Sequence, residues 1–170
     1  MAVCRFCDTD FVGVDGVGGG KFASAEDLAA AVDGKWPADS GGGWKFVVCT
    51  GGEPLLQLDA AAIKALHGRG FEIAVETNGT VAAPDGIDWV CVSPKAGAPM
   101  IQRSGDELKL VFPQIGFDPP QFEGLAFRNF FLQPMDGPNR VRNTQLAVQY
   151  CLDHPQWRLS LQTHKILGIA

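Results

Sequence analysis

The chain has 170 residues, enough for one domain of ordinary size with a substantial apolar core. Hydrophobic residues make up 46% of it and charged residues 19%, the balance of a soluble globular protein. The 14 Lys and Arg residues against 19 Asp and Glu residues give a net charge of −5, which argues against nucleic-acid binding, since phosphate contacts need clustered cations. The first residues have neither the basic segment nor the apolar core of a signal peptide, and no apolar run approaches the ~20 residues of a membrane span, so we expect a cytoplasmic protein with no membrane partner.

The five cysteines are an odd number and are unevenly placed. Cys4 and Cys7 form a C-x-x-C pair at the start of the chain, whereas Cys49, Cys91 and Cys151 are scattered. This pattern is not the disulfide framework of a small secreted fold, and we interpret the scattered three as buried, reduced thiols. The pair could hold a soft metal centre, and its spacing alone leaves an iron–sulfur cluster and zinc as equal alternatives.

Helices and strands alternate along the chain. The sequence predicts helices behind candidate N-caps: Ser24 before a helix reaching residue 32, Asp59 before 60–69, and Asn143 before 144–152. Short apolar runs predict strands, in chain order, at 45–50, 71–76, 89–93, 108–112, 129–133 and 158–162. This alternation predicts an α/β domain around a mostly parallel sheet, either open or closed into a barrel. No linker divides the chain, so we expect a single domain over residues 1–170.

Polar segments follow the predicted strands. They are Thr50-Gly51-Gly52-Glu53-Pro54, Glu76-Thr77-Asn78-Gly79, Ser93-Pro94-Lys95, Gln133-Pro134-Met135-Asp136 and Gln162-Thr163-His164-Lys165. In parallel α/β folds the carboxyl ends of the strands share one face, and that face carries the active site. Each segment alone is also typical of a turn. Together they predict one convergent pocket.

Taken together, these motifs resemble a known enzyme family. A C-x-x-C pair that encloses an aromatic residue, followed by a strand ending in Gly-Gly-Glu-Pro, resembles the radical S-adenosylmethionine enzymes. Later segments narrow the resemblance to the 7-carboxy-7-deazaguanine synthase family: Cys-Asp-Thr-Asp-Phe at 7–11, Glu-Thr-Asn-Gly-Thr at 76–80, Ser-Pro-Lys at 93–95, Gln-Pro-Met-Asp at 133–136 and Gln-Thr-His-Lys at 162–165. The order and spacing of these segments carry the resemblance, which runs from residue 4 to residue 165.

The resemblance implies cofactors and residues that hold them. The family binds a four-iron, four-sulfur (4Fe-4S) cluster through three cysteines, and Cys4 and Cys7 match the second and third of these. One iron is left for S-adenosyl-L-methionine, and the residues implied to bind that cofactor are Phe6, Gly51, Gly52, Glu53, Ser93 and Gln133. Thr9 matches a position that helps to coordinate magnesium beside the substrate. The residues implied to lie near the substrate are Thr50, Asn78, His164, Lys165 and the chain-terminal Ala170.

The implied activity is that of a lyase in queuosine (7-deazapurine) biosynthesis. An electron from a flavodoxin-like or other donor would release a 5′-deoxyadenosyl radical, which abstracts hydrogen from 6-carboxy-5,6,7,8-tetrahydropterin. Ring contraction with loss of ammonia would then give 7-carboxy-7-deazaguanine. The implied fold is a reduced, incomplete TIM-like barrel of mostly parallel strands, and the family tends toward homodimers.

The sequence departs from the family pattern at its start. The family's first cysteine lies upstream, on a loop after an N-terminal strand, whereas only Met1-Ala2-Val3 precedes Cys4. We therefore expect an N-terminally incomplete radical S-adenosylmethionine-type domain that lacks the family's first strand and first cluster cysteine. Two hypotheses follow: an enzyme whose recorded sequence starts late, or a non-catalytic relic that binds a pterin- or purine-like ligand or a zinc ion.

Overall fold

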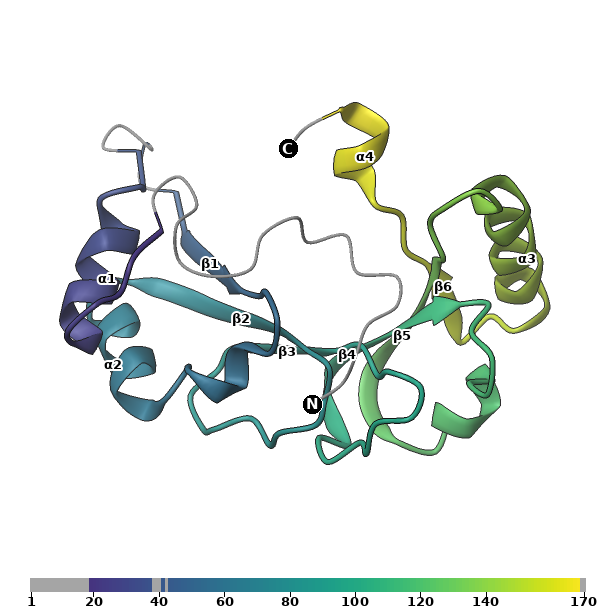
Figure 1. Cartoon of the computed structure of the whole chain (residues 1–170), viewed down its shortest axis with the longest axis horizontal. Coiled ribbons are helices and arrows are strands. Elements are labelled where there is room, and N and C mark those ends of the chain that lie inside the picture. Colours follow the sequence, from purple (N-terminus) through teal and green to yellow (C-terminus); the bar gives the residue numbers. More distant parts are fainter. Residues whose placement is uncertain (1–18, 38–40, 42, 169–170) are drawn as a thin grey trace. The chain divides into compact units, whose positions relative to one another are not determined.

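A computed structural model describes residues 19–37, 41 and 43–168 of the chain. Its strands form a six-stranded sheet in the order β1-β2-β3-β4-β5-β6, with parallel pairing (Figure 1). The strands are β1 (Lys45–Cys49), β2 (Phe71–Thr77), β3 (Trp89–Val92), β4 (Ser104–Phe112), β5 (Ala126–Pro134) and β6 (Trp157–Leu159). The helices are α1 (Ala25–Asp33), α2 (Ala60–Gly68), α3 (Arg140–Asp153) and α4 (Thr163–Leu167), with short 3-10 turns η1 (Pro54–Leu56) and η2 (Pro119–Phe122). The α/β class and the parallel sheet are confirmed, and the consecutive strand order is that of a partial TIM-like barrel.

The chain divides into two compact units. The β1–β2 unit contains the described residues up to 76 together with 83–90. The β3–β6 unit contains residues 77–82 and the described residues from 91 onward. Each unit has its own core.

In the β1–β2 unit, local capping chemistry sets the starts of both helices. The Ser24 hydroxyl accepts a hydrogen bond from the Asp27 N–H at 3.1 Å, and the Asp59 carboxylate accepts one from the Ala62 N–H at 2.8 Å. Each cap satisfies a main-chain donor that has no partner within its helix. Both predicted caps are confirmed.

The core of the β1–β2 unit lies between β2 and its helices. Alternate residues of β2, Phe71, Ile73 and Val75, are at most 4% exposed, which places one face of the strand in the core. Ile63 and Leu66 on α2 are also buried. β1 pairs with β2 in parallel register from Lys45 opposite Phe71 to Cys49 opposite Val75. This pairing sets the carboxyl end of β1 beside that of β2.

The core of the β3–β6 unit is built on β4, β5 and β6. Leu108, Leu110 and Leu132 are fully buried, and Trp157 is 2% exposed. The indole N–H of Trp157 donates to the Glu123 carboxylate at 2.9 Å, so this ring is buried without an unpaired donor. Helix α3 packs against β5 and β6.

The structure differs from the sequence prediction at several element ends. β4 and β5 begin at Ser104 and Ala126, before the predicted starts at 108 and 129, because these added residues pair with each other across the sheet. β6 ends at Leu159 rather than at residue 162, and the short helix α4 follows it. The pattern of apolar residues did not predict either change.

The predicted cap of the third helix is wrong. α3 begins at Arg140, so Asn143 lies inside the first turn rather than at the N-cap, which is Asn139. Asn143 is 8% exposed, and its amide donates to the carbonyl of Met135 at 2.8 Å. The side chain therefore ties the helix to the segment after β5.

Across the described part of the chain, no helix combines the length and the apolar character needed to cross a bilayer.

Gly79 follows the end of β2 and belongs to the β3–β6 unit. This residue offers a test of packing. Its φ is +79°, and an added Cβ would lie 2.8 Å from Cγ1 of Val92. Gly116 has the same φ, but nothing lies within 4 Å of its Cβ position. We expect Gly79→Ala to lower the free energy of unfolding by about 1–3 kcal/mol more than Gly116→Ala, since both carry the backbone strain but only Gly79 overpacks the core. Urea unfolding of the two variants measures this difference, and equal losses would show that Val92 moves aside.

Candidate functional site

The carboxyl end of β2 forms a tight turn whose main-chain groups are held by side chains. Thr77 is 2% exposed, and its hydroxyl accepts from the Gly79 N–H at 3.0 Å. The Asn78 side chain accepts from the Thr80 N–H at 2.9 Å, which fixes the orientation of its amide. The Gly79 carbonyl accepts from the N–H groups of Ile101 and Gln102. Asn78, a predicted substrate residue, therefore sits on a rigid turn.

The carboxyl end of β3 lies beside this turn. The Ser93 N–H donates to the carbonyl of Thr77 at 2.8 Å, which continues the parallel pairing beyond the strand. The Lys95 ammonium donates to the Ser93 carbonyl at 2.5 Å and to its hydroxyl at 2.9 Å. Lys95 therefore orients Ser93, the residue that the sequence assigns to the cofactor.

The ends of β4 and β5 add two amide side chains. Gln133 lies within β5, opposite Val111 of β4, and is half-buried. Gln114 follows β4, and its side-chain oxygen accepts from the Ala96 N–H at 3.2 Å. Gln114 is not among the predicted site residues, although it follows a predicted strand as several of them do.

An ion pair joins α4 to the end of β5. The Lys165 ammonium donates to the Asp136 carboxylate at 2.7 Å. The Lys165 hydrogen bond, together with one from the Gly137 N–H, holds the pKa of Asp136 below its usual value. No residue of α4 is buried, so apolar packing contributes little to holding this helix in place. The ion pair ties Lys165 to the segment after β5, and His164 beside it is exposed.

A hollow of about 250 Å³ lies next to this ion pair. Its lining comes from the end of β5, from the segments after β5 and β6, from the start of α3 and from α4. The lining residues are Pro134, Asp136, Arg140, Thr144, Leu161, Gln162, Lys165 and Ile166. Apolar walls with a few charged groups are typical of small-molecule sites. Two of the five polar segments that the sequence places at strand ends, 133–136 and 162–165, contribute to this lining.

The Thr50–Glu53 segment belongs to the β1–β2 unit and follows β1. Gly51 has a φ of +123°, and nothing lies within 4 Å of the Cβ position of either Gly51 or Gly52. A ligand can therefore approach this main chain closely. The Glu53 carboxylate accepts from the Leu55 N–H at 3.1 Å and so caps η1, while Thr50 is exposed.

The predicted metal ligands lie outside the described residues, as do the other site residues near the two ends of the chain. These are Cys4, Phe6, Cys7, Thr9 and Ala170.

The other three cysteines are predicted to be buried thiols. Cys91 is buried, as predicted, whereas Cys49 and Cys151 are half-buried. Burial raises the pKa of both half-buried thiols, which disfavours the thiolate that binds metals. In the part of the chain that the structure describes, no group of three or more His, Cys, Asp or Glu side chains could hold a metal ion.

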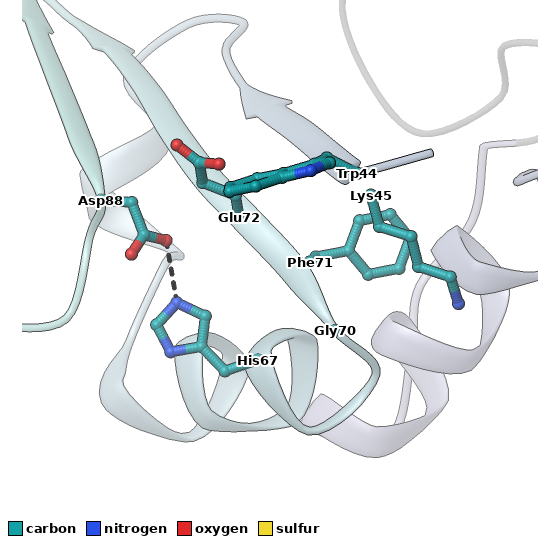
Figure 2. A pocket seen from close by; sticks show the side chains of 7 residues that line it. All are labelled: Trp44, Lys45, His67, Gly70, Phe71, Glu72 and Asp88. Carbon is teal, nitrogen blue, oxygen red and sulfur yellow. Dashed lines mark hydrogen bonds and ion pairs between the residues drawn. The ribbon is translucent and has the colours of Figure 1, made fainter. Parts of the chain in front are cut away.

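A larger hollow, of about 490 Å³, lies at the opposite, amino ends of β1 and β2 (Figure 2). It is lined by Trp44, Lys45, His67, Gly70, Phe71, Glu72 and Asp88, none of which is a predicted site residue. Nε2 of His67 lies 2.9 Å from Oδ2 of Asp88, and the same carboxylate oxygen accepts from the Ile73 N–H at 2.8 Å. Burial raises the pKa of Asp88, but these two hydrogen bonds outweigh it and leave the pKa below its usual value. The groups of this hollow thus tie α2 and the segment before β3 to β2, a structural role.

Comparison with known proteins shows which proteins this chain is similar to. The chain is 69% identical over 168 residues to the 7-carboxy-7-deazaguanine synthase of Caulobacter vibrioides and 62% identical over 168 residues to that of Bradyrhizobium diazoefficiens. Each alignment covers 99% of this chain and 79% of the relative. The crystal structure of QueE from Escherichia coli superposes with a TM-score of 0.59 at 26% identity, covering 82% of this chain and 64% of that one. No protein-family model matches.

The parallel sheet and the structural similarity to QueE define an α/β protein of the partial TIM-barrel type. At this level of identity, over nearly the whole chain, the protein belongs to the 7-carboxy-7-deazaguanine synthase family. The family resemblance read from the motifs is thereby confirmed.

The Asp136–Lys165 ion pair predicts how firmly α4 is held. Removing the carboxylate with Asp136→Asn should raise the hydrogen-exchange rate of α4 amides about 1.4- to 5-fold at neutral pH, since a partly exposed ion pair contributes ~0.2–1 kcal/mol. Because the pKa of Asp136 is lowered in the folded chain, this stabilisation is present above the unfolded pKa of about 3.9 and is lost as the pH falls through the folded value.

Asp153→Asn is the matched control, since the Asp153 carboxylate accepts from the Gln149 amide on its own helix, α3. It should leave α4 exchange unchanged. Equal exchange in the wild type and in Asp136→Asn would mean that α4 is held by something other than this ion pair.

Proposed function

We propose that this protein catalyses the radical-mediated ring contraction of 6-carboxy-5,6,7,8-tetrahydropterin to 7-carboxy-7-deazaguanine, with release of ammonia. The observation that carries the proposal is the 69% identity to a 7-carboxy-7-deazaguanine synthase across 99% of the chain. The polar segments at the carboxyl ends of the strands agree with it, because this is where parallel α/β enzymes bind their ligands. The reaction is that of a carbon–nitrogen lyase in 7-deazapurine, or queuosine, biosynthesis.

The described residues fit S-adenosyl-L-methionine as a ligand. The main chain at Gly51 and Gly52 is open where a side chain would otherwise stand. A buried amide donor of Gln114 also lacks a hydrogen-bond partner among the described residues at the end of β4. With Ser93 and Gln133, these groups would bind the cofactor, while Cys4 and Cys7 would hold the 4Fe-4S cluster and Thr9 the magnesium ion. When bound, the cluster and S-adenosyl-L-methionine supply radical chemistry that side chains cannot.

The chain's own residues bind and orient the substrate in this proposal. The Lys165 ammonium carries three donors, so it can bond Asp136 and also a carboxylate oxygen of the pterin. Asn78 offers an amide whose orientation is fixed by the Thr80 N–H. Thr50 and the exposed His164 would complete the polar contacts, and the apolar wall formed by Leu161 and Ile166 would limit the access of water.

The electron donor and the assembly state are part of the proposal. A small, flavodoxin-like protein is proposed as the donor, on the strength of the family resemblance. A homodimer is proposed on the same ground.

Anaerobic reconstitution tests the function directly. The chain is loaded with iron and sulfide, and we expect bound iron, cleavage of S-adenosyl-L-methionine to 5′-deoxyadenosine, and 7-carboxy-7-deazaguanine detectable by mass spectrometry when the pterin is added. The Caulobacter vibrioides synthase treated in the same way is the positive control. A chain that stays free of cluster and yields neither product would contradict the enzyme, and pterin binding by that chain would favour the relic instead.

Lys165 tests the substrate site. We expect Lys165→Met to raise the KM for the pterin about tenfold or more, because a hydrogen bond to a charged group is worth about 1.5–3 kcal/mol. Lys64→Met is the matched control, since Lys64 is an exposed residue of α2 that lines neither hollow. Steady-state kinetics measures both variants, and an unchanged KM in Lys165→Met would remove Lys165 from the substrate site.

A further inference from the structure

Gln114 occupies a strand end that no motif of the family resemblance covers. It follows β4, and its side-chain oxygen accepts from the Ala96 N–H at 3.2 Å. Ala96 comes directly after the Ser93-Pro94-Lys95 segment. The side chain of Gln114 therefore spans from the end of β4 to the end of β3, within one compact unit.

The other end of this amide is unsatisfied. Nε2 of Gln114 is buried and has no hydrogen-bond partner among the described residues. Exchanging the oxygen and nitrogen of the amide would not relieve this, because the nitrogen would then face the Ala96 N–H, donor against donor. Burial of a polar donor without a partner is costly, so a group in this state calls for an explanation.

The position of Gln114 suggests what it binds. Arg69 and Tyr150 also carry a buried polar atom that has no partner within the described ranges, but Arg69 caps the carboxyl end of α2 and Tyr150 lies within α3. Gln114 lies at the carboxyl end of a parallel strand, where ligands of this fold class bind. Its neighbour through Ala96 is the segment of Ser93, which the sequence assigns to the cofactor.

We propose that Nε2 of Gln114 donates a hydrogen bond to an oxygen or ring-nitrogen acceptor of S-adenosyl-L-methionine. This proposal rests on the proposed function. The Ala96 bond fixes the direction of the donor before the ligand arrives, and this preorganisation reduces the entropy lost on binding. Nε2 is inaccessible to water in the unliganded chain, so the ligand can reach it only when the atoms around it move.

Gln114→Glu isolates the donor. The substitution keeps the size of the side chain and the oxygen that accepts from Ala96, and it replaces the amide donor with a second acceptor oxygen. Equilibrium dialysis of radiolabelled S-adenosyl-L-methionine against the reconstituted chain should show binding about tenfold or more weaker than in the wild type. Gln121→Glu, which makes the same change of charge at an exposed position of η2 in the same unit, should bind as the wild type does.

Thermal unfolding of the variants guards against a structural cause. If Gln114→Glu does not fold, Gln114→Met removes the donor without adding a charge, and its affinity is measured instead. Unchanged affinity in a folded Gln114 variant, or an equal loss in Gln121→Glu, would overturn the role of Gln114 while the proposed function stands. A wild-type chain that takes up the cluster but does not bind S-adenosyl-L-methionine would overturn the proposed function, and this role with it.

Discussion

Parallel pairing of the strands is the constraint on which the site depends. In a parallel sheet every strand ends at the same edge, and the main-chain groups beyond the last pair must find other partners. In this chain the partners come from the polar segments themselves. The Thr77 hydroxyl accepts from the Gly79 N–H, and the Asn78 side-chain oxygen accepts from the Thr80 N–H. The Lys95 ammonium donates to the Ser93 hydroxyl. The residues that form the motifs therefore have two tasks, since they close the sheet edge and also present polar groups there. Satisfying the backbone is what makes that polar edge rigid.

The parts of the fold that depend on neighbours in sequence could be predicted from the sequence. Ser24 and Asp59 cap their helices as expected, because a cap needs only a donor two or three residues ahead. The strand at 71–77 was predictable because its alternate residues are apolar and its inner face is buried. The order of the polar segments, together with the family resemblance, predicts a site at the carboxyl ends of the strands.

Features set by distant partners could not be predicted. Ser104 and Gly105 have no strand-like pattern, and they are extended because Ala126 and Phe127 pair with them. Asn143 has the chemistry of a helix cap, yet the Met135 carbonyl provides its partner and the helix begins earlier. Asp136 belongs to a predicted segment, but nothing in the sequence shows that it holds Lys165, which lies on another element. In each case the contact that decides the structure is made with a residue on another element or segment. The local propensity of the residue itself does not reveal that partner.

Two amide side chains show how structure separates a structural residue from a binding residue. Asn143 lies in the first turn of α3 and Gln114 follows β4, and the sequence assigns neither of them to a ligand. The Asn143 amide donates to Met135, so its burial is compensated within the protein, and removing it would cost stability. The Gln114 amide is satisfied on its oxygen, whereas its nitrogen has no partner among the described residues, so the direction of the donor is fixed and its bond is left open there. A folded chain accepts that cost where another molecule completes the bond, and this argues that the edge of the sheet at β3 and β4 is shaped for a ligand as well as for stability.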